Sequence, residues 1–115
     1  MHEGHFTENI VTAIIGELKK YPDKKVESVT VKIGETYHLA PDSVLMHYDL
    51  ISKGTPLEGV RLNLVEEPLK VLCGQCGQQG PVEDHHLLLC TFCSSHQVKP
   101  VSGESVTIDQ IKFRP

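Results

Sequence analysis

Apolar residues recur at helical spacing near the start of the chain, which predicts an amphipathic helix over residues 7–20. Thr7 offers a hydroxyl that can cap the first turn, and Glu8 suits the positive end of the helix dipole. Pro22 ends the helix because proline cannot continue the hydrogen-bond pattern. The predicted apolar face consists of Ile10, Val11, Ile14, Ile15 and Leu18.

Further along, alternation of apolar and polar residues predicts strands. A second helix starts at Pro41 and stops before Gly54. The last strand breaks strict alternation once, which predicts a bulge near Asp109. Together these elements predict an α+β fold, with two helices packed on a three-stranded mixed sheet. The three strands are expected at residues 26–33, 60–65 and 106–113.

Residues 70–98 differ in composition from the rest of the chain. They hold all four cysteines and too few apolar residues to form a core of their own. Such a segment is expected to fold only around a metal. The sequence therefore predicts a domain made of residues 1–69 with 99–115, and a zinc-ribbon-like lobe of residues 70–98 inserted before its last strand.

The four cysteines form two C-x2-C pairs with thirteen residues between the pairs. Each pair sets two thiolates on one tight turn, and two such turns make a tetrahedral cage that suits structural zinc. Iron in a rubredoxin-like cage is the next option, but only Phe92 could shield it. Redox chemistry of the thioredoxin type would leave the second pair unexplained. The predicted zinc ligands are Cys73, Cys76, Cys90 and Cys93.

The chain opens with a second candidate metal centre, Met1-His2-Glu3. A free amine on Met1, the His2 peptide nitrogen and the His2 imidazole can close fused chelate rings around one ion. The amide or carboxylate of Glu3 is available as a fourth donor. Nitrogen-rich, near-planar donor sets favour Ni(II) or Cu(II) over zinc, so this end of the chain predicts a nickel or copper site.

Composition narrows the classes of function. The chain has 115 residues, a formal net charge of −4 and no long cluster of basic residues, which argues against a nucleic-acid surface. It has no apolar run of membrane-spanning length and no signal segment at its start, so we expect a cytoplasmic protein with reduced cysteines. With no Ser/His/Asp arrangement, phosphate-binding glycine loop or open metal site, an enzyme is the weakest reading.

Six short motifs occur in a fixed order along the chain. They are Met1-His2-Glu3, Val29 to Glu35, Gly54 to Val60, Cys73 to Gly77, Cys90 to Cys93, and Gly103-Glu104. In this combination the chain resembles, over essentially its whole length, the HypA/HybF family of nickel metallochaperones for [NiFe]-hydrogenase maturation.

The resemblance implies metal delivery rather than catalysis. It implies that Ni(II) is cargo, bound by His2 with Met1 and Glu3, and that zinc on the four cysteines is structural. The implied partners are a nickel-handling maturation GTPase and a hydrogenase large subunit, with urease and its accessory proteins for some members. The sequence leaves open which enzyme receives nickel, whether the zinc site senses nickel loading or pH, and whether the chain is a monomer or a homodimer.

The chain also departs from the family pattern. Gly4-His5 follows the opening motif where small or apolar residues are usual, and Thr91 and Ser94 replace a proline and a glycine in the second cysteine turn. The alternative function is a zinc-ribbon adaptor for protein interaction without specific nickel binding. The sequence does not decide which further histidines join the nickel site; the candidates are His5, His85, His86 and His96.

Overall fold

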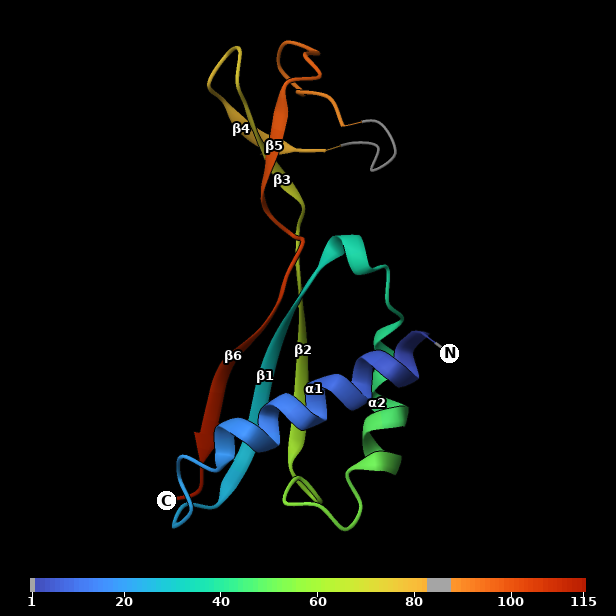
Figure 1. Cartoon of the computed structure of the whole chain (residues 1–115), viewed down its shortest axis with the longest axis vertical. Helices are drawn as coiled ribbons and strands as arrows, with labels where there is room; N and C mark the ends of the chain where they lie inside the picture. The colour runs from blue at the N-terminus through green and yellow to red at the C-terminus, as the bar shows by residue number, and fades with distance from the viewer. Residues whose placement is uncertain (1, 83–87) are drawn as a thin grey trace. The chain divides into compact units, whose positions relative to one another are not determined.

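The computed structural model describes residues 2–82 and 88–115 (Figure 1). The chain divides into two compact units. The helical unit comprises Met1–Val31, Leu39–Leu64 and Ile108–Pro115. The cysteine unit comprises Lys32–His38 and Val65–Thr107.

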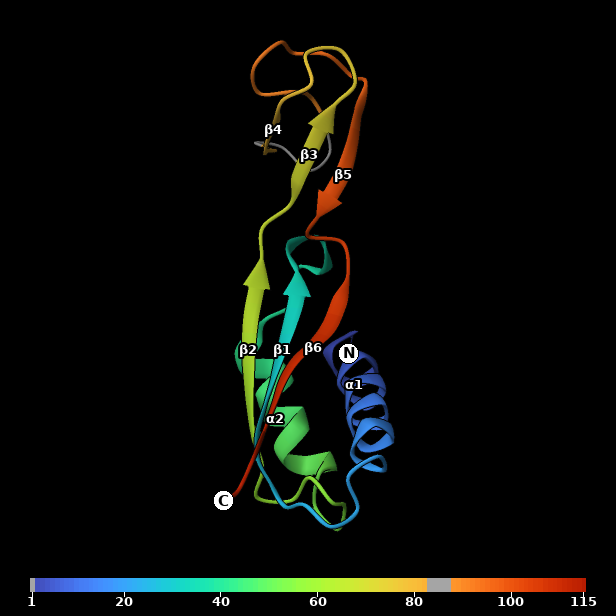
Figure 2. The same ribbon diagram turned by 90° about the vertical axis from the view of Figure 1, so that its left-hand side faces the viewer.

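The first sheet has the strand order β2-β1-β6. Its strands are β1 (Val26–Gly34), β2 (Arg61–Glu67) and β6 (Val106–Phe113). The arrows of β1 and β2 run in the same direction and β6 runs against them, so the sheet is mixed (Figures 1 and 2). Helices α1 (His2–Leu18) and α2 (Pro41–Ile51) pack against one another in the helical unit. The predicted α+β fold is confirmed.

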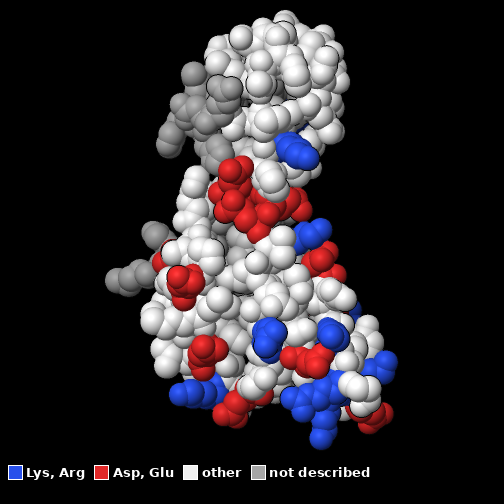
Figure 3. Space-filling model, turned by 180° about the vertical axis from the view of Figure 1, so that it is seen from behind, with Lys and Arg blue, Asp and Glu red and all other residues white. Residues whose placement is uncertain are grey.

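The two faces of this sheet differ in polarity. On one face Val29, Val31 and Leu62 are buried with the apolar sides of the helices. The other face carries Ser28 and Thr30 in an open polar groove. Figure 3 views the molecule from the side opposite α1 and shows basic side chains beside acidic ones. The difference between the two faces follows from the alternation of apolar and polar residues along the strands, which is typical of a sheet with one buried face.

Helix α1 begins at His2, five residues before the predicted start at residue 7, and ends at Leu18 rather than residue 20. The predicted cap was wrong, because Thr7 lies inside the helix and is fully buried. Its hydroxyl donates a hydrogen bond to the backbone oxygen of Glu3, one turn earlier. A threonine satisfied in this way behaves as an interior helix residue rather than as a cap.

The other predicted elements of this sheet and its helices are present with small shifts. Helix α2 starts at Pro41, and Gly54 beyond its end has the left-handed φ of 78°. Strand β2 continues two residues beyond the predicted end, to Glu67. In β6 two successive residues, Asp109 and Gln110, are exposed where the alternation was expected to break. Among the described residues, none of the helices is long and apolar enough to cross a membrane.

The cysteine unit contains a second, unpredicted sheet with the order β4-β3-β5. Its strands are β3 (Lys70–Cys73), β4 (Gln79–Pro81) and β5 (Val98–Ser102). Both β4 and β5 pair with β3 in the antiparallel sense. The strands are short, and β4 and β5 each contain a proline, so they carry too little alternation to be recognised from sequence. Leu69 and Val71 are buried and contribute its apolar interior.

A close crossing of two glycines forms the base of the cysteine unit. A Cβ on Gly34 would clash with the backbone oxygen of Gly103, and Gly103 has a φ of 88°. The Gly34 N–H donates to the oxygen of Ser105 at 2.8 Å, and the Leu69 N–H donates to Oε1 of Glu35 at 2.7 Å. The short 3-10 helix η1 (Glu35–Tyr37) follows the crossing. Residues near 35, 69 and 104 are therefore joined by backbone contacts and by the side chain of Glu35.

Candidate metal centres

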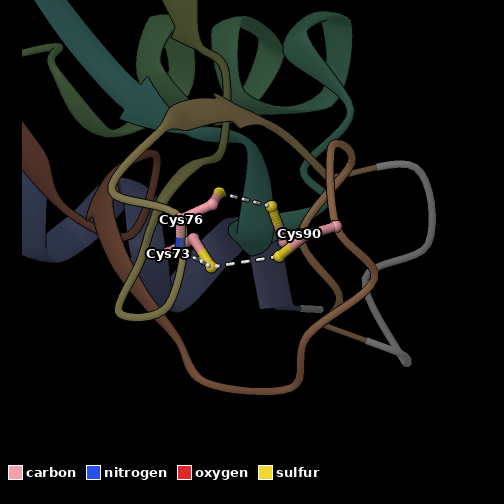
Figure 4. A group of neighbouring side chains, drawn as sticks. Cys73, Cys76 and Cys90 are labelled. Atoms are coloured by element: carbon pink, nitrogen blue, oxygen red, sulfur yellow. Dashed lines mark hydrogen bonds between the residues drawn. The ribbon is translucent and has the colours of Figure 1, made fainter.

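The four cysteine sulfurs converge in the cysteine unit, where all four Sγ atoms lie within 4.8 Å of one another. The Sγ atoms of Cys73 and Cys93 are 3.6 Å apart, and those of Cys76 and Cys90 are also 3.6 Å apart. Figure 4 shows Cys73, Cys76 and Cys90 pointing toward a common centre from two loops. Cys73 and Cys90 are buried, whereas Cys76 and Cys93 are exposed.

Both cysteine pairs sit on turns with the same backbone hydrogen bonds. The N–H of Gly77 donates to the oxygen of Cys73 at 3.1 Å, and the N–H of Ser94 donates to the oxygen of Cys90 at 2.9 Å. The residue that closes each turn has a left-handed φ, 74° at Gly77 and 61° at Ser94. The serine that departs from the family pattern therefore adopts the conformation that glycine adopts in the first turn.

Backbone N–H groups also point at the sulfurs. The N–H groups of Gln75 and Cys76 lie 3.3 and 3.4 Å from Sγ of Cys73, and the Phe92 N–H lies 3.4 Å from Sγ of Cys90. Hydrogen bonds from Cys76 and Gln75 lower the pKa of Cys73 to about 6, against the opposing effect of desolvation. The thiol of Cys73 therefore ionises to a thiolate more readily than an ordinary cysteine.

The neighbouring thiols oppose ionisation of the whole cluster. The Ser95 N–H lowers the pKa of Cys93, but the Cys73 thiol and desolvation outweigh it, and this pKa is raised to about 12. Four negative sulfurs at these distances repel one another strongly unless a cation lies between them. The cluster therefore has the electrostatic character of a cation site.

The geometry fits a tetrahedral metal. A metal–sulfur bond of about 2.3 Å places tetrahedral sulfurs about 3.8 Å apart, close to the two observed spacings of 3.6 Å. The four cysteines are free thiols rather than disulfides. Four sulfurs complete the coordination of a tetrahedral ion and leave no position for water or a substrate, so the cage suits a structural role.

The amino-terminal candidate lies at the start of α1. His2 is the first residue of the helix, and the first N–H groups of a helix have no acceptor within it. N–H groups of Glu3 itself and of Ala40 lower the pKa of the Glu3 carboxyl and keep it ionised, although desolvation opposes them. Met1 and the side chain of His2 lie outside what the structure describes, so it does not test their predicted role as ligands.

The remaining histidines are distributed over both units. His5 is 92% exposed in its side chain, with Nδ1 4.0 Å from Oε2 of Glu8. His96 is exposed in the cysteine unit, and His85 and His86 lie outside the described residues. Sequence reasoning gave no metal role to His47, which is half-buried and lies against Gly4. The signal in the sequence was Gly4, because a glycine inside a helix can mark a place where another side chain packs closely against the backbone.

Comparison with known proteins gives the family. Residues 1–113 match the family model described as "HypA: Hydrogenase/urease nickel incorporation, metallochaperone, hypA". The chain belongs to the HypA family. A hydrogenase maturation factor HypA of Methanothermobacter thermautotrophicus is 34% identical, over 98% of this chain and 97% of that protein. The HypA of Nostoc punctiforme is 36% identical, over 98% of this chain and 96% of that protein.

Solved structures agree on the fold. The solution structure of the Ni metallochaperone HypA from Helicobacter pylori superposes with a TM-score of 0.70 at 19% identity, covering 98% of this chain and 97% of that one. HypA proteins are nickel metallochaperones of hydrogenase maturation and not enzymes. The resemblance drawn from the sequence motifs is thereby confirmed.

Proposed function

We propose that this protein binds Ni(II) as cargo through Met1, His2 and Glu3 and delivers it during [NiFe]-hydrogenase maturation. The observation that carries the proposal is membership of the HypA family over residues 1–113, which includes the opening motif. A terminal amine, backbone amides and one imidazole form a donor set suited to nickel. Because α1 starts at His2, the amide of Glu3 belongs to a first turn whose N–H groups are not used within the helix.

The proposal gives the four cysteines a different task. Cys73, Cys76, Cys90 and Cys93 hold a structural Zn(II), because their cage has tetrahedral spacing and no open position. Residues 70–98 form an inserted zinc-binding domain, while residues 1–69 with 99–115 form the nickel-binding domain. The metal stabilises the smaller domain, whose own apolar interior is slight.

Delivery needs partners on both sides of the transfer. We assign a nickel-handling maturation GTPase as the protein that acts with this one, and a hydrogenase large subunit as the recipient. We include urease accessory proteins as further partners, because the family description names hydrogenase and urease together. The proposed location is the cytoplasm, and a homodimer is compatible with this role.

The test is a calorimetric nickel titration of untagged protein, alongside its His2→Ala variant and a count of bound zinc. We expect one tightly bound nickel per chain in the wild type only, and one zinc in both proteins. His5→Ala is the matched control, because it removes an exposed imidazole three residues along the same helix. Equal and weak nickel binding by all three proteins would refute the proposal and favour a zinc-organised adaptor for protein interaction.

A further inference from the structure

The imidazole of His47 on α2 lies against the first turn of α1. A Cβ placed on Gly4 would be 3.5 Å from both Nε2 and Cδ2 of this ring. Both residues belong to the helical unit, in which α1 and α2 pack against each other. Gly4 is only two residues from His2, within one turn of the same helix. A side chain able to bind a metal therefore reaches from a second helix to the helical turn that carries the proposed nickel ligands.

The orientation of the ring leaves the nitrogen nearer to α1 able to bind a metal. The other ring nitrogen, Nδ1, is 2.7 Å from the backbone oxygen of Ser43. A carbonyl oxygen can only accept, so Nδ1 carries the proton and donates it. In the neutral ring Nε2 then holds a lone pair. Metal-binding histidines are commonly fixed in this way, by donating their second ring N–H to a backbone carbonyl.

Gly4 is what leaves room for this approach. A methyl group at residue 4 would already be in van der Waals contact with the ring, and a longer side chain would enter the space that the ring occupies. The approach of Nε2 to the first turn of α1 therefore depends on the absence of a side chain at residue 4.

We infer that Nε2 of His47 is a further ligand of the nickel held at the amino terminus. This inference rests on the proposed function and adds to it a donor from α2, so the bound ion would link the start of α1 to the middle of α2. His5 has no such part, because its ring is exposed and lies near Glu8. The site would then carry two imidazoles, those of His2 and His47.

The test uses His47→Asn, because the asparagine amide can still donate to the Ser43 oxygen while the position of Nε2 is removed. A second variant, Gly4→Leu, keeps the imidazole but fills the space in front of it. Nickel affinity is measured by calorimetry on the untagged full chain, with His5→Asn and His2→Ala as controls. X-ray absorption of the nickel-loaded proteins counts imidazole ligands independently of affinity.

We expect His47→Asn and Gly4→Leu to weaken nickel binding about tenfold, equivalent to about 1.4 kcal/mol, and to reduce the imidazole count from two to one. His5→Asn should match the wild type. If His2→Ala loses nickel while His47→Asn keeps the wild-type affinity and imidazole count, the inference is overturned and the proposed function stands. If the wild type itself binds no nickel tightly, both fail.

Discussion

The two candidate metal centres differ in how the backbone holds their ligands. In the cysteine unit each pair of sulfurs sits on a turn closed by a backbone hydrogen bond, with further N–H groups aimed at sulfur. At the start of α1 the candidate ligands belong to a chain end and to a helical turn whose N–H groups have no backbone acceptor within the helix. One centre is enclosed by its own loops, and the other is built from groups that remain available.

Under the proposed function, this difference would allow one small protein to hold one metal as a resident ion and another as cargo. A closed cage of four thiolates offers no place for an incoming ligand, so exchange of its ion is slow and its ion suits a resident role. A terminal amine, amides and an imidazole leave edges of the ion open to an acceptor. Selectivity then comes from donor geometry rather than from affinity alone. The predictions below separate the two centres, from the largest expected effect to the smallest.

Removal of one cysteine should abolish folding of one region only. Cys73→Ala or Cys90→Ala is expected to unfold residues 70–98, because metal binding supplies most of the folding free energy of that segment. The rest of the chain keeps its own buried core and should stay folded. Residue-resolved amide hydrogen exchange measures this, with Gln75→Ala in the same turn as the control. Simultaneous loss of protection in both regions would contradict the division.

An extension at the amino terminus should affect the other centre only. Adding two residues before Met1 displaces the amine from the chelate, so we expect nickel affinity to fall by at least about a hundredfold, or roughly 2.7 kcal/mol. The zinc content should not change. Calorimetry and metal analysis test this, and the same two residues added at the carboxyl end provide the control. Undiminished nickel binding by the amino-terminal extension would exclude the amine as a ligand.

Strong base should destabilise the helical unit through Tyr48. Tyr48 is buried, and its hydroxyl donates to the backbone oxygen of Val60 at 2.7 Å. Desolvation, with a smaller effect of Asp49, raises the pKa of Tyr48 to about 12 from its ordinary value of 10. Folding therefore favours the protonated phenol. Its stabilising effect is complete below pH 10, is lost as pH rises to about 12, and amounts to on the order of 2 kcal/mol.

The measurement is urea unfolding of wild type and Tyr48→Phe between pH 8 and pH 12. The variant lacks the hydrogen bond and should be less stable by about 1 kcal/mol at neutral pH. It should also lack the alkaline loss that belongs to Tyr48, so the stability of the wild type should fall to that of the variant and then below it as pH approaches 12. Tyr21→Phe is the control because Tyr21 is 40% exposed. Parallel curves for wild type and Tyr48→Phe would show that Tyr48 does not cause the effect.

The smallest predicted effect is confined to the second cysteine turn. Ser94 has a φ of 61°, and this left-handed conformation is higher in free energy for a residue with a side chain than for glycine. Ser94→Gly should therefore stabilise the metal-bound cysteine unit by roughly 0.5–1 kcal/mol, and Gly77→Ser should destabilise it by a similar amount. Competition with a chelator measures both, and nickel binding should not change. A destabilising Ser94→Gly would indicate that the serine side chain itself contributes to the turn.

Much of the architecture could be predicted because its signals are local and repeated. The apolar periodicity of α1 and α2 and the alternation of β1 and β6 each extend over several residues. The four cysteines could be grouped because their spacing alone restricts the turns that carry them. The four sulfurs converge within 4.8 Å, as this spacing predicts for a metal site.

The missed features depend on particular contacts rather than on the periodicity of apolar residues. The early start of α1 depends on Thr7, whose hydroxyl bonds back to Glu3 and makes a residue typical of caps suitable for a helix interior. The sheet β4-β3-β5 is held by pairing across a long loop rather than by apolar alternation. The contact between Gly4 and His47 joins two helices. The periodicity of apolar residues in either helix does not indicate it.

The glycine crossing at the base of the cysteine unit has a consequence for how the protein is made. Its hydrogen bonds join Gly34 to Ser105 and Thr36 to Gly103, so its two sides are separated by about seventy residues of chain. During synthesis the early side must wait until the late side has left the ribosome. The cysteine loops, although their ligands emerge earlier, stay without a fixed base over that interval. The cysteine unit can therefore be completed only after nearly the whole chain has been synthesised.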